Sequence, residues 1–173
     1  MPPERKVAGS TPAAGTNSCS SPVLHMDQAV SMRRGGALPT ILLVEDFDDT
    51  RLMMKMWLVK NGYRVLEAET GEEGVALAQQ ELPDLIIMDM MMPRMNGLDA
   101  AQRIREHGDL SQTPIVAVSA YGSDEYRSLA LEAGCDEYVS TPFEPGILSE
   151  LIKSLLGREE SADLNAAQAN IGH

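Results

Sequence analysis

The stretch Ile41-Leu42-Leu43-Val44-Glu45-Asp46 joins four consecutive apolar residues to two acids. A short apolar run of this kind, bounded by polar residues, predicts a buried β-strand over Thr40–Glu45. The residues that follow, Asp48–Lys60, have the pattern of a helix, with Asp48 or Asp49 as the N-cap. The ordered part of the chain is therefore expected to begin with a strand and a helix.

The same alternation of a short apolar run with a helical segment recurs four more times along the chain. The expected strands are Thr40–Glu45, Tyr63–Ala68, Asp84–Met88, Pro114–Ser119 and Glu137–Ser140. The expected helices are Asp48–Lys60, Thr70–Glu81, Gly97–His107, Ser123–Ala133 and Glu144–Leu156. This alternation predicts an α/β fold, a doubly wound five-stranded parallel sheet with helices on both faces. The strands are apolar throughout, as strands covered on both faces should be.

Composition and charge divide the chain into three parts. Residues 1–38 are rich in Pro, Ser, Thr, Ala and Gly and are expected to form a disordered N-terminal tail. Residues 39–157 form the expected domain, and residues 158–173 form an expected flexible C-terminal tail. The domain contains 9 basic and 21 acidic residues, so it accounts for the whole net charge of −12.

This composition also excludes some classes of partner. A strongly acidic surface repels nucleic acid, so no nucleic-acid partner is expected. The sequence has no apolar run approaching the roughly 20 residues that a membrane helix needs, and its N-terminus lacks the apolar core of a signal peptide. No membrane association is expected, and the expected location is cytoplasmic.

Acidic residues follow two of the expected strands, at the edge where a doubly wound sheet places its reactive site. Glu45 and Asp46 end the first strand, and Asp89 ends the third. Those strands are neighbours in such a sheet, so the carboxylates are expected within a few ångströms of one another. A single Asp here could simply cap a helix or a turn, but converging acids repel one another unless a cation intervenes. Oxygen ligands of this kind fit Mg²⁺.

Several short motifs along the domain share the order and spacing of one known family. They are Ile41–Asp46 (ILLVED), Asp89–Gly97 (DMMMPRMNG), Val118-Ser119-Ala120, Ala133–Tyr138 (AGCDEY) and Thr141-Pro142-Phe143. Together they resemble the CheY-like receiver domain of response regulators, over residues 39–157. The resemblance implies a flavodoxin-like sheet with the strand order 2-1-3-4-5.

The resemblance assigns roles to the acidic residues. It implies that Asp89 accepts a phosphoryl group from a phosphohistidine on a sensor histidine kinase or a histidine phosphotransfer protein. It also implies that Asp46, Asp89 and the backbone carbonyl of Met91 bind Mg²⁺ directly, and that Glu45 is an outer ligand that binds it through water. Such a protein is not a turnover enzyme, because it is modified on its own side chain and at most dephosphorylates itself. A phosphohydrolase would usually have a second Asp where this chain has Met91.

The resemblance further implies a conformational switch. Ser119 would bind the phosphoryl group, and Tyr138 would move with it, although a strand-end hydroxyl and a core aromatic are the simpler roles for these two side chains. The family has a lysine at the position of Thr141. A lysine ammonium would pair with the acceptor carboxylate and then with the phosphoryl group, whereas threonine offers only a neutral hydroxyl.

Two functions follow from this resemblance. The first is a stand-alone response regulator in phosphorelay signal transduction. Its output would be protein–protein contact through the face formed by the fourth helix, the fifth strand and the fifth helix. The second is a degenerate receiver, a binding module that works without phosphorylation, and Thr141 favours this alternative.

Overall fold

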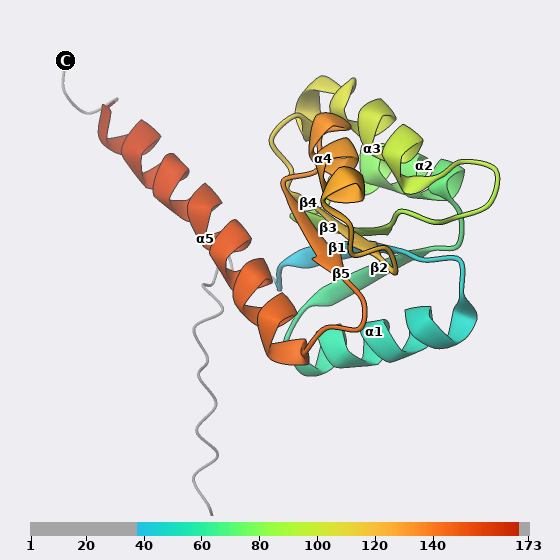
Figure 1. Ribbon diagram of the computed structural model, residues 1–173. Coiled ribbons are helices and arrows are strands. Elements are labelled where there is room, and N and C mark those ends of the chain that lie inside the picture. The colour runs from blue at the N-terminus through green and yellow to red at the C-terminus, as the bar shows by residue number, and fades with distance from the viewer. Residues whose placement is uncertain (1–37, 170–173) are drawn as a thin grey trace, which may run out of the picture.

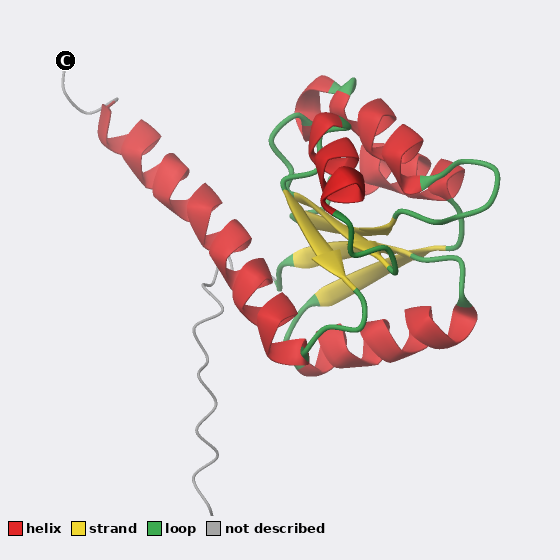
Figure 2. Ribbon diagram, in the orientation of Figure 1, coloured by secondary structure: helices red, strands yellow, loops and turns green. Residues whose placement is uncertain are grey.

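The structure, a computed structural model, describes residues 38–169, and the side chains of residues 38–157. Residues 1–37, in the expected N-terminal tail, and residues 170–173 lie outside the described residues. The described part forms a parallel sheet with helices packed on both of its faces (Figures 1 and 2).

Five strands and five α-helices alternate along the chain, as the sequence pattern predicts. The strands are β1 (Thr40–Val44), β2 (Arg64–Ala68), β3 (Leu85–Asp89), β4 (Ile115–Ser119) and β5 (Glu137–Ser140). The helices are α1 (Asp48–Lys60), α2 (Gly71–Glu81), α3 (Gly97–Arg105), α4 (Asp124–Glu132) and α5 (Pro145–Ala169), with a 3₁₀ turn η1 (Gly108–Leu110) before β4.

All strands are parallel, and their order across the sheet is β2-β1-β3-β4-β5. This order confirms the predicted flavodoxin-like fold. The helices α1 and α5 cover one face of the sheet, and α2, α3 and α4 cover the other (Figure 2). Because the chain reverses its winding direction after β2, β1 and β3 lie side by side, and a crevice forms beyond their carboxyl ends.

Alternate residues of the strands enter two separate cores. Leu42 and Val44 of β1 pack with residues of α2, α3 and α4, whereas Ile41 and Leu43 pack with residues of α1 and α5. These four side chains are at most 1% exposed, so β1 is covered on both faces as predicted, whereas the edge strand β2 is only partly buried.

The N-termini of α1 and α2 are capped in different ways. Thr70 caps α2, because its hydroxyl accepts a hydrogen bond from the N–H of Glu73 at 3.2 Å. The N-cap of α1, however, is Phe47 and not Asp48 or Asp49, and no side chain makes a cap bond there. Those two acids lie instead in the first turn of α1, where their negative charges interact favourably with the positive end of the helix dipole.

The prediction that the last helix ends at Leu156 is wrong, because α5 continues to Ala169. Residues 158–169, expected as part of a flexible tail, are helical and extend away from the sheet (Figure 1). Their sequence contains no proline or glycine and is rich in alanine and glutamate, which favour helix formation, while Gly157 alone costs only about 1 kcal/mol. Within residues 38–169, no helix has the length and apolar character needed to cross a membrane.

Candidate functional site

The acidic residues that the sequence places at strand ends come together in the structure. In the sheet, Val44 of β1 pairs with Met88 of β3, so the residues that follow them share one edge. Carboxylate oxygens of Glu45, Asp46 and Asp89 lie within 4.8 Å of one another. The predicted convergence of these side chains is therefore present.

The three acids differ in their surroundings. Glu45 is 7% exposed, Asp89 is half-buried, and Asp46 is exposed. Burial, and next the charge of Asp89, raises the pKa of Glu45 to about 7, against a smaller opposing effect of the hydrogen bond from the Phe47 N–H. Burial also raises the pKa of Asp89, and the charge of Asp46 adds to this effect. Ionisation of these clustered carboxyl groups therefore costs free energy, and a bound cation would offset this cost.

The loop after β3 holds the Asp89 carboxylate in place. The backbone N–H of Met91 donates a hydrogen bond to Asp89 Oδ1 at 3.0 Å. At the end of the loop, the Asn96 side chain caps α3 by accepting from the N–H of Asp99 at 2.9 Å. Gly97 lies so close to the loop that a Cβ there would be 2.3 Å from the carbonyl oxygen of Asp89, so only glycine fits.

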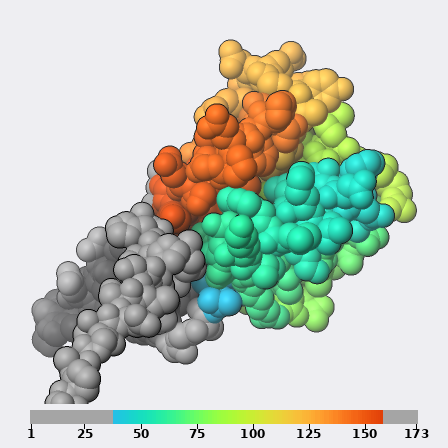
Figure 3. Space-filling view, turned by 90° about the horizontal axis from the view of Figure 1, so that it is seen from below, coloured from blue at the N-terminus to red at the C-terminus, as the bar shows by residue number. Residues whose placement is uncertain are grey.

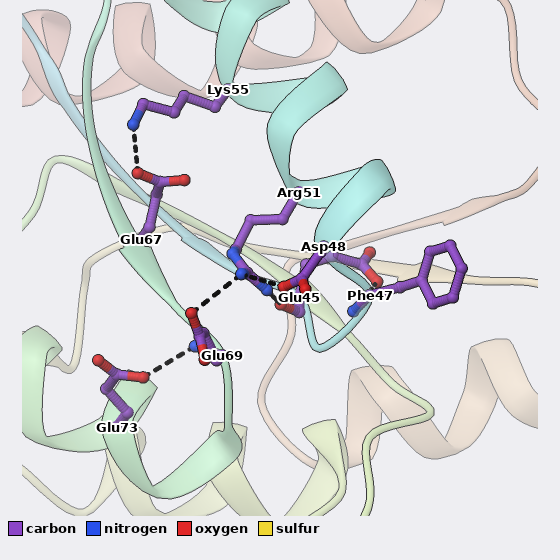
Figure 4. A network of polar contacts seen from close by, with 8 residues as sticks. All are labelled: Glu45, Phe47, Asp48, Arg51, Lys55, Glu67, Glu69 and Glu73. Carbon is purple, nitrogen blue, oxygen red and sulfur yellow. Dashed lines mark hydrogen bonds and ion pairs between the residues drawn. The ribbon is translucent and has the colours of Figure 1, made fainter.

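A polar network centred on Arg51 supports the loop that carries Glu45 (Figure 4). The buried guanidinium of Arg51 donates to the backbone carbonyl of Glu45 at 2.9 Å, and to the carboxylates of Asp48 and Glu69 at 2.5 and 3.0 Å. Glu69 follows β2, so Arg51 ties the ends of the first two strands together. The spacing of Asp48 and Arg51 on one helix indicates an ion pair, but nothing in the sequence predicts the bonds from Arg51 to Glu45 and Glu69.

The Arg51→Lys variant is expected to lower the free energy of unfolding by about 1–3 kcal/mol. Lysine keeps the charge, but it lacks the planar guanidinium group with which arginine reaches three separate acceptors. Urea unfolding at pH 7 would measure the change, with Arg103→Lys on the exposed face of α3 as the matched control. Equal effects of the two substitutions would show that the network around Arg51 contributes nothing specific.

The remaining predicted site residues lie at the end of β4, in β5 and directly after β5. Ser119 is 1% exposed, and its hydroxyl accepts a hydrogen bond from the N–H of Tyr121 at 3.2 Å. The hydroxyl of Tyr138, a buried residue of β5, donates to the backbone carbonyl of Tyr121. The exposed Thr141 donates its N–H to the backbone carbonyl of Ser119 at 2.8 Å. Nothing in the sequence pointed to Tyr121, which connects Ser119 and Tyr138.

A cavity of about 510 Å³ opens beside the acidic cluster. Glu45, Asp89, Met91, Ser119 and Thr141 all line it, so the structure gathers five of the seven predicted site residues around one space. Asp46 lies outside its lining, although its carboxylate belongs to the cluster, and Tyr138 is a buried residue of the core.

The donor atoms of the cluster suit a hard divalent cation. Glu45, Asp46 and Asp89 offer carboxylate oxygens close enough together to share one ion. Oxygen is the ligand atom that Mg²⁺ prefers, and Mg²⁺ is commonly bound by one or two carboxylates with waters completing the shell. The residues present therefore fit a Mg²⁺ site.

The fold and the site define a doubly wound α/β domain with an acidic pocket at the carboxyl ends of its central strands. The family model of the response regulator receiver domain matches residues 41–153. The chain belongs to this family, whose members act in two-component phosphorelays.

Relatives of the chain include both kinases and regulators. Histidine kinase P4 of Formosa agariphila is 38% identical over 152 residues, which are 88% of this chain and 11% of that protein. The transcriptional regulatory protein AfsQ1 of Streptomyces coelicolor is 35% identical over 130 residues, which are 75% of this chain and 56% of that protein. The chain thus spans less than two thirds of the length of these relatives.

Solved structures show the same fold. The receiver domain of the sensor histidine kinase PA1611 from Pseudomonas aeruginosa has a TM-score of 0.66 and 30% identity, over 70% of this chain and 99% of that one. That structure has a magnesium ion coordinated in its active site cleft. The chemotaxis protein CheY4 of Vibrio cholerae has a TM-score of 0.66 and 29% identity, over 69% of this chain and 99% of that one.

Proposed function

We propose that Asp89 accepts a phosphoryl group from a phosphohistidine, and that the protein works as a response regulator. The observation that carries this proposal is the position of Asp89, which shares one sheet edge with Glu45 and Asp46 and borders a cavity. The Asp89 carboxylate would attack phosphorus in line, and the histidine nitrogen would leave with its electron pair. The N–H of Met91, already bonded to Asp89 Oδ1, orients the carboxylate.

The residues that would hold Mg²⁺ are Glu45, Asp46, Asp89 and the backbone carbonyl of Met91. When bound, the ion supplies positive charge that neutralises the transferring phosphoryl oxygens. The chain itself contributes the oxygen ligands and their rigid support, because Arg51 fixes the backbone carbonyl of Glu45 at 2.9 Å.

Ser119 would transmit the conformational effect of phosphorylation to the surface. Its hydroxyl lines the same cavity as Asp89 and can donate to a phosphoryl oxygen while it accepts from Tyr121. The Tyr121 ring stacks on Tyr126 of α4, with centroids 4.8 Å apart, and its carbonyl accepts from Tyr138. A shift of Ser119 would therefore move both α4 and the aromatic side chain of β5.

The partners follow from this arrangement. A sensor histidine kinase or a histidine phosphotransfer protein would supply the phosphoryl group. The output partner would be a protein that contacts the face formed by α4, β5 and α5, and both helices carry exposed apolar side chains, such as Leu129 of α4 and Ile147 of α5, which are 41% and 54% exposed. Such exposed apolar side chains are suited to protein contact.

Acetyl phosphate labelling with Mg²⁺ tests the proposal directly. One phosphoryl group per chain is expected. It should not form when EDTA is present during the incubation, and hydroxylamine should release it, as it releases an acyl phosphate. Intact mass spectrometry and peptide mapping would place it on Asp89. An unmodified chain after incubation with both acetyl phosphate and several histidine kinases would contradict the proposal.

That negative result would support the second candidate, a degenerate receiver that binds its partner without phosphorylation. Thr141 favours this candidate, because the family resemblance places a lysine there, and no basic residue lines the cavity beside Asp89 within the described part of the chain. A partner that binds the unmodified protein and its Asp89→Asn variant with the same affinity would establish it.

The Thr141→Lys variant is expected to accept phosphate from acetyl phosphate about tenfold faster than the natural chain. Thr141 lines the cavity with Asp89, so an ammonium at this position can neutralise the phosphoryl oxygens with a bond worth about 1.5–3 kcal/mol, less the screening at an exposed position. Labelling rates at saturating Mg²⁺ would measure the change. Thr141→Met, which adds a long side chain without charge, is the control, and an equal gain in both variants would exclude a charge effect.

A further inference from the structure

The methionines around the acidic cluster differ in their access to solvent. Met88 lies in β3, and Met90, Met92 and Met95 lie in the loop that follows; each of the four is at most 6% exposed. Met91 is 46% exposed, although it lies between two of them. A solute in water can therefore reach the thioether of Met91, whereas the neighbouring sulfur atoms are shielded.

Met91 also borders the cavity beside the acidic cluster. It lines that space together with Asp89 and Ser119, and its backbone N–H donates to Asp89 Oδ1 at 3.0 Å. Much of the remaining wall is apolar, as at Trp57 and Phe143, and none of the described residues that line it is basic. A polar group added to Met91 would therefore alter the surroundings of Asp89, with no cationic side chain in the lining to compensate for it.

The thioether of an accessible methionine reacts with hydrogen peroxide. A lone pair on sulfur attacks one peroxide oxygen, and the O–O bond breaks. The leaving hydroxide takes up the proton of the transferred oxygen, so one sulfoxide and one water form; sulfur loses two electrons and the peroxide gains them. The side chain changes from apolar to polar, because the new oxygen carries partial negative charge and accepts hydrogen bonds.

We propose that Met91 is an oxidation site, at which hydrogen peroxide forms a sulfoxide that hinders the entry of phosphoryl groups into the cavity. The sulfoxide oxygen would repel the phosphoryl oxygens that approach Asp89, and it would attract water into the apolar part of the cavity. Acceptance of phosphate would then depend on the level of peroxide. The oxidation of Met91 stands by itself, whereas its effect on phosphoryl transfer rests on the proposed function.

Two further exposed methionines provide comparisons within the same chain. They are Met53 and Met56 of α1, which lies at the surface beside α5 (Figure 3), and they are 66% and 65% exposed. Met53 lines the cavity, whereas Met56 does not. Met56 is therefore the matched control, because it has the exposure of a reactive thioether but not the position beside Asp89.

The first experiment treats the full, folded chain with hydrogen peroxide, removes the excess with catalase, and maps the oxidised residues by mass spectrometry. Met53, Met56 and Met91 should each gain one oxygen atom, whereas the buried methionines of β3 and the loop after it should stay reduced until urea unfolds the chain. Buried Cys135 should not compete, because burial raises the pKa of its thiol to about 12 and the thiolate is the reactive form.

The second experiment measures the consequence. The rate of labelling by acetyl phosphate at saturating Mg²⁺ should fall about fivefold after oxidation. Methionine sulfoxide reductases A and B together should restore the rate, because each acts on one sulfoxide epimer. Dithiothreitol alone, which reduces oxidised cysteines but not methionine sulfoxide, should not restore it.

Leucine variants assign the effect to one residue, because leucine is similar in size to methionine and peroxide does not oxidise it. Met91→Leu should be labelled at the same rate before and after peroxide treatment. Met53→Leu and Met56→Leu should still be slowed about fivefold, like the natural chain. Equal slowing of Met91→Leu and the natural chain would overturn the inference, and so would oxidation of the buried methionines as fast as that of Met91.

A further readout separates this inference from the proposed function. Beryllium fluoride mimics a phosphoryl group without being transferred, and Trp57, the only tryptophan of the chain, lines the cavity and can report its binding in Mg²⁺ by fluorescence. Oxidation should weaken this binding about fivefold. Weaker binding after oxidation, with no labelling of any form of the chain, would contradict only the proposed function. Labelling and binding that are both unchanged by oxidation would contradict only this inference, and the absence of both would contradict both.

Discussion

Replacement of Asp89 by asparagine is expected to abolish modification by acetyl phosphate and by phosphohistidine donors completely. The carboxamide keeps the shape of the side chain and can still accept the hydrogen bond that Met91 N–H now donates at 3.0 Å. It has no anionic oxygen to attack phosphorus, so the reaction loses its nucleophile while the loop keeps its support. Intact mass spectrometry after incubation with Mg²⁺ and acetyl phosphate would measure the loss.

The matched control for this variant is Asp99→Asn, because Asp99 is an exposed acid in the first turn of α3. It should be labelled like the natural chain. The Asp89→Asn variant should remain folded, since burial and the charge of Asp46 raise the pKa of Asp89 and thus make its ionised form costly. Full labelling of folded Asp89→Asn would show that another group, such as Asp46, is the acceptor.

The fold could be predicted from the sequence because its signals are local. Each strand is a short apolar run, and each helix begins and ends near polar or glycine residues, so the alternation was visible without any tertiary contact. The end of α5 was missed because Gly157 has the character of a helix stop and the sequence after it looked like a polar tail, although the helix continues through it to Ala169. Phe47 replaced the expected aspartate caps because the Glu45 carboxylate accepts the N–H of Phe47 at 3.2 Å and fixes the turn before α1.

The carboxylates of the site could be predicted for a similar reason, since a parallel sheet places the ends of neighbouring strands at one edge. The surroundings of these carboxylates could not be predicted. The bond from Arg51 to Glu69 joins residues 18 positions apart, and the cavity beside the acidic cluster depends on how α1 and α5, two helices distant in sequence, pack on one face. Such features are set by tertiary packing, which leaves no periodic signal in a single sequence.

The environment of Glu45 leads to the second prediction, which concerns the dependence of stability on pH in the absence of metal. The pKa of Glu45 rises from 4.5 to about 7 in the folded protein, mainly through burial and then through Asp89. A raised carboxyl pKa means that the folded state favours the protonated form. Its contribution to stability is therefore complete below pH 4.5 and is lost as the pH rises through about 7.

The Glu45→Gln variant should not show this loss, because glutamine remains neutral at every pH. The quantity to compare is the free energy of unfolding of the variant minus that of the natural chain. In EDTA, this difference is expected to be more positive at pH 8 than at pH 4 by up to about 3 kcal/mol. Urea unfolding at the two pH values would measure the change, with Glu72→Gln on the exposed face of α2 as the control. Parallel pH profiles for the natural chain and Glu45→Gln would show that Glu45 titrates as an ordinary surface acid.

Addition of Mg²⁺ at pH 8 should stabilise the natural chain more than Glu45→Gln. A cation bound by the cluster stabilises the ionised form of Glu45, so the natural chain regains the stability that it lost on deprotonation. Glu45→Gln has one carboxylate fewer and should gain less from the same Mg²⁺ concentration. If Mg²⁺ stabilised both proteins equally, Glu45 would have no part in binding the ion, and the site would reduce to Asp46, Asp89 and the backbone of the loop after β3.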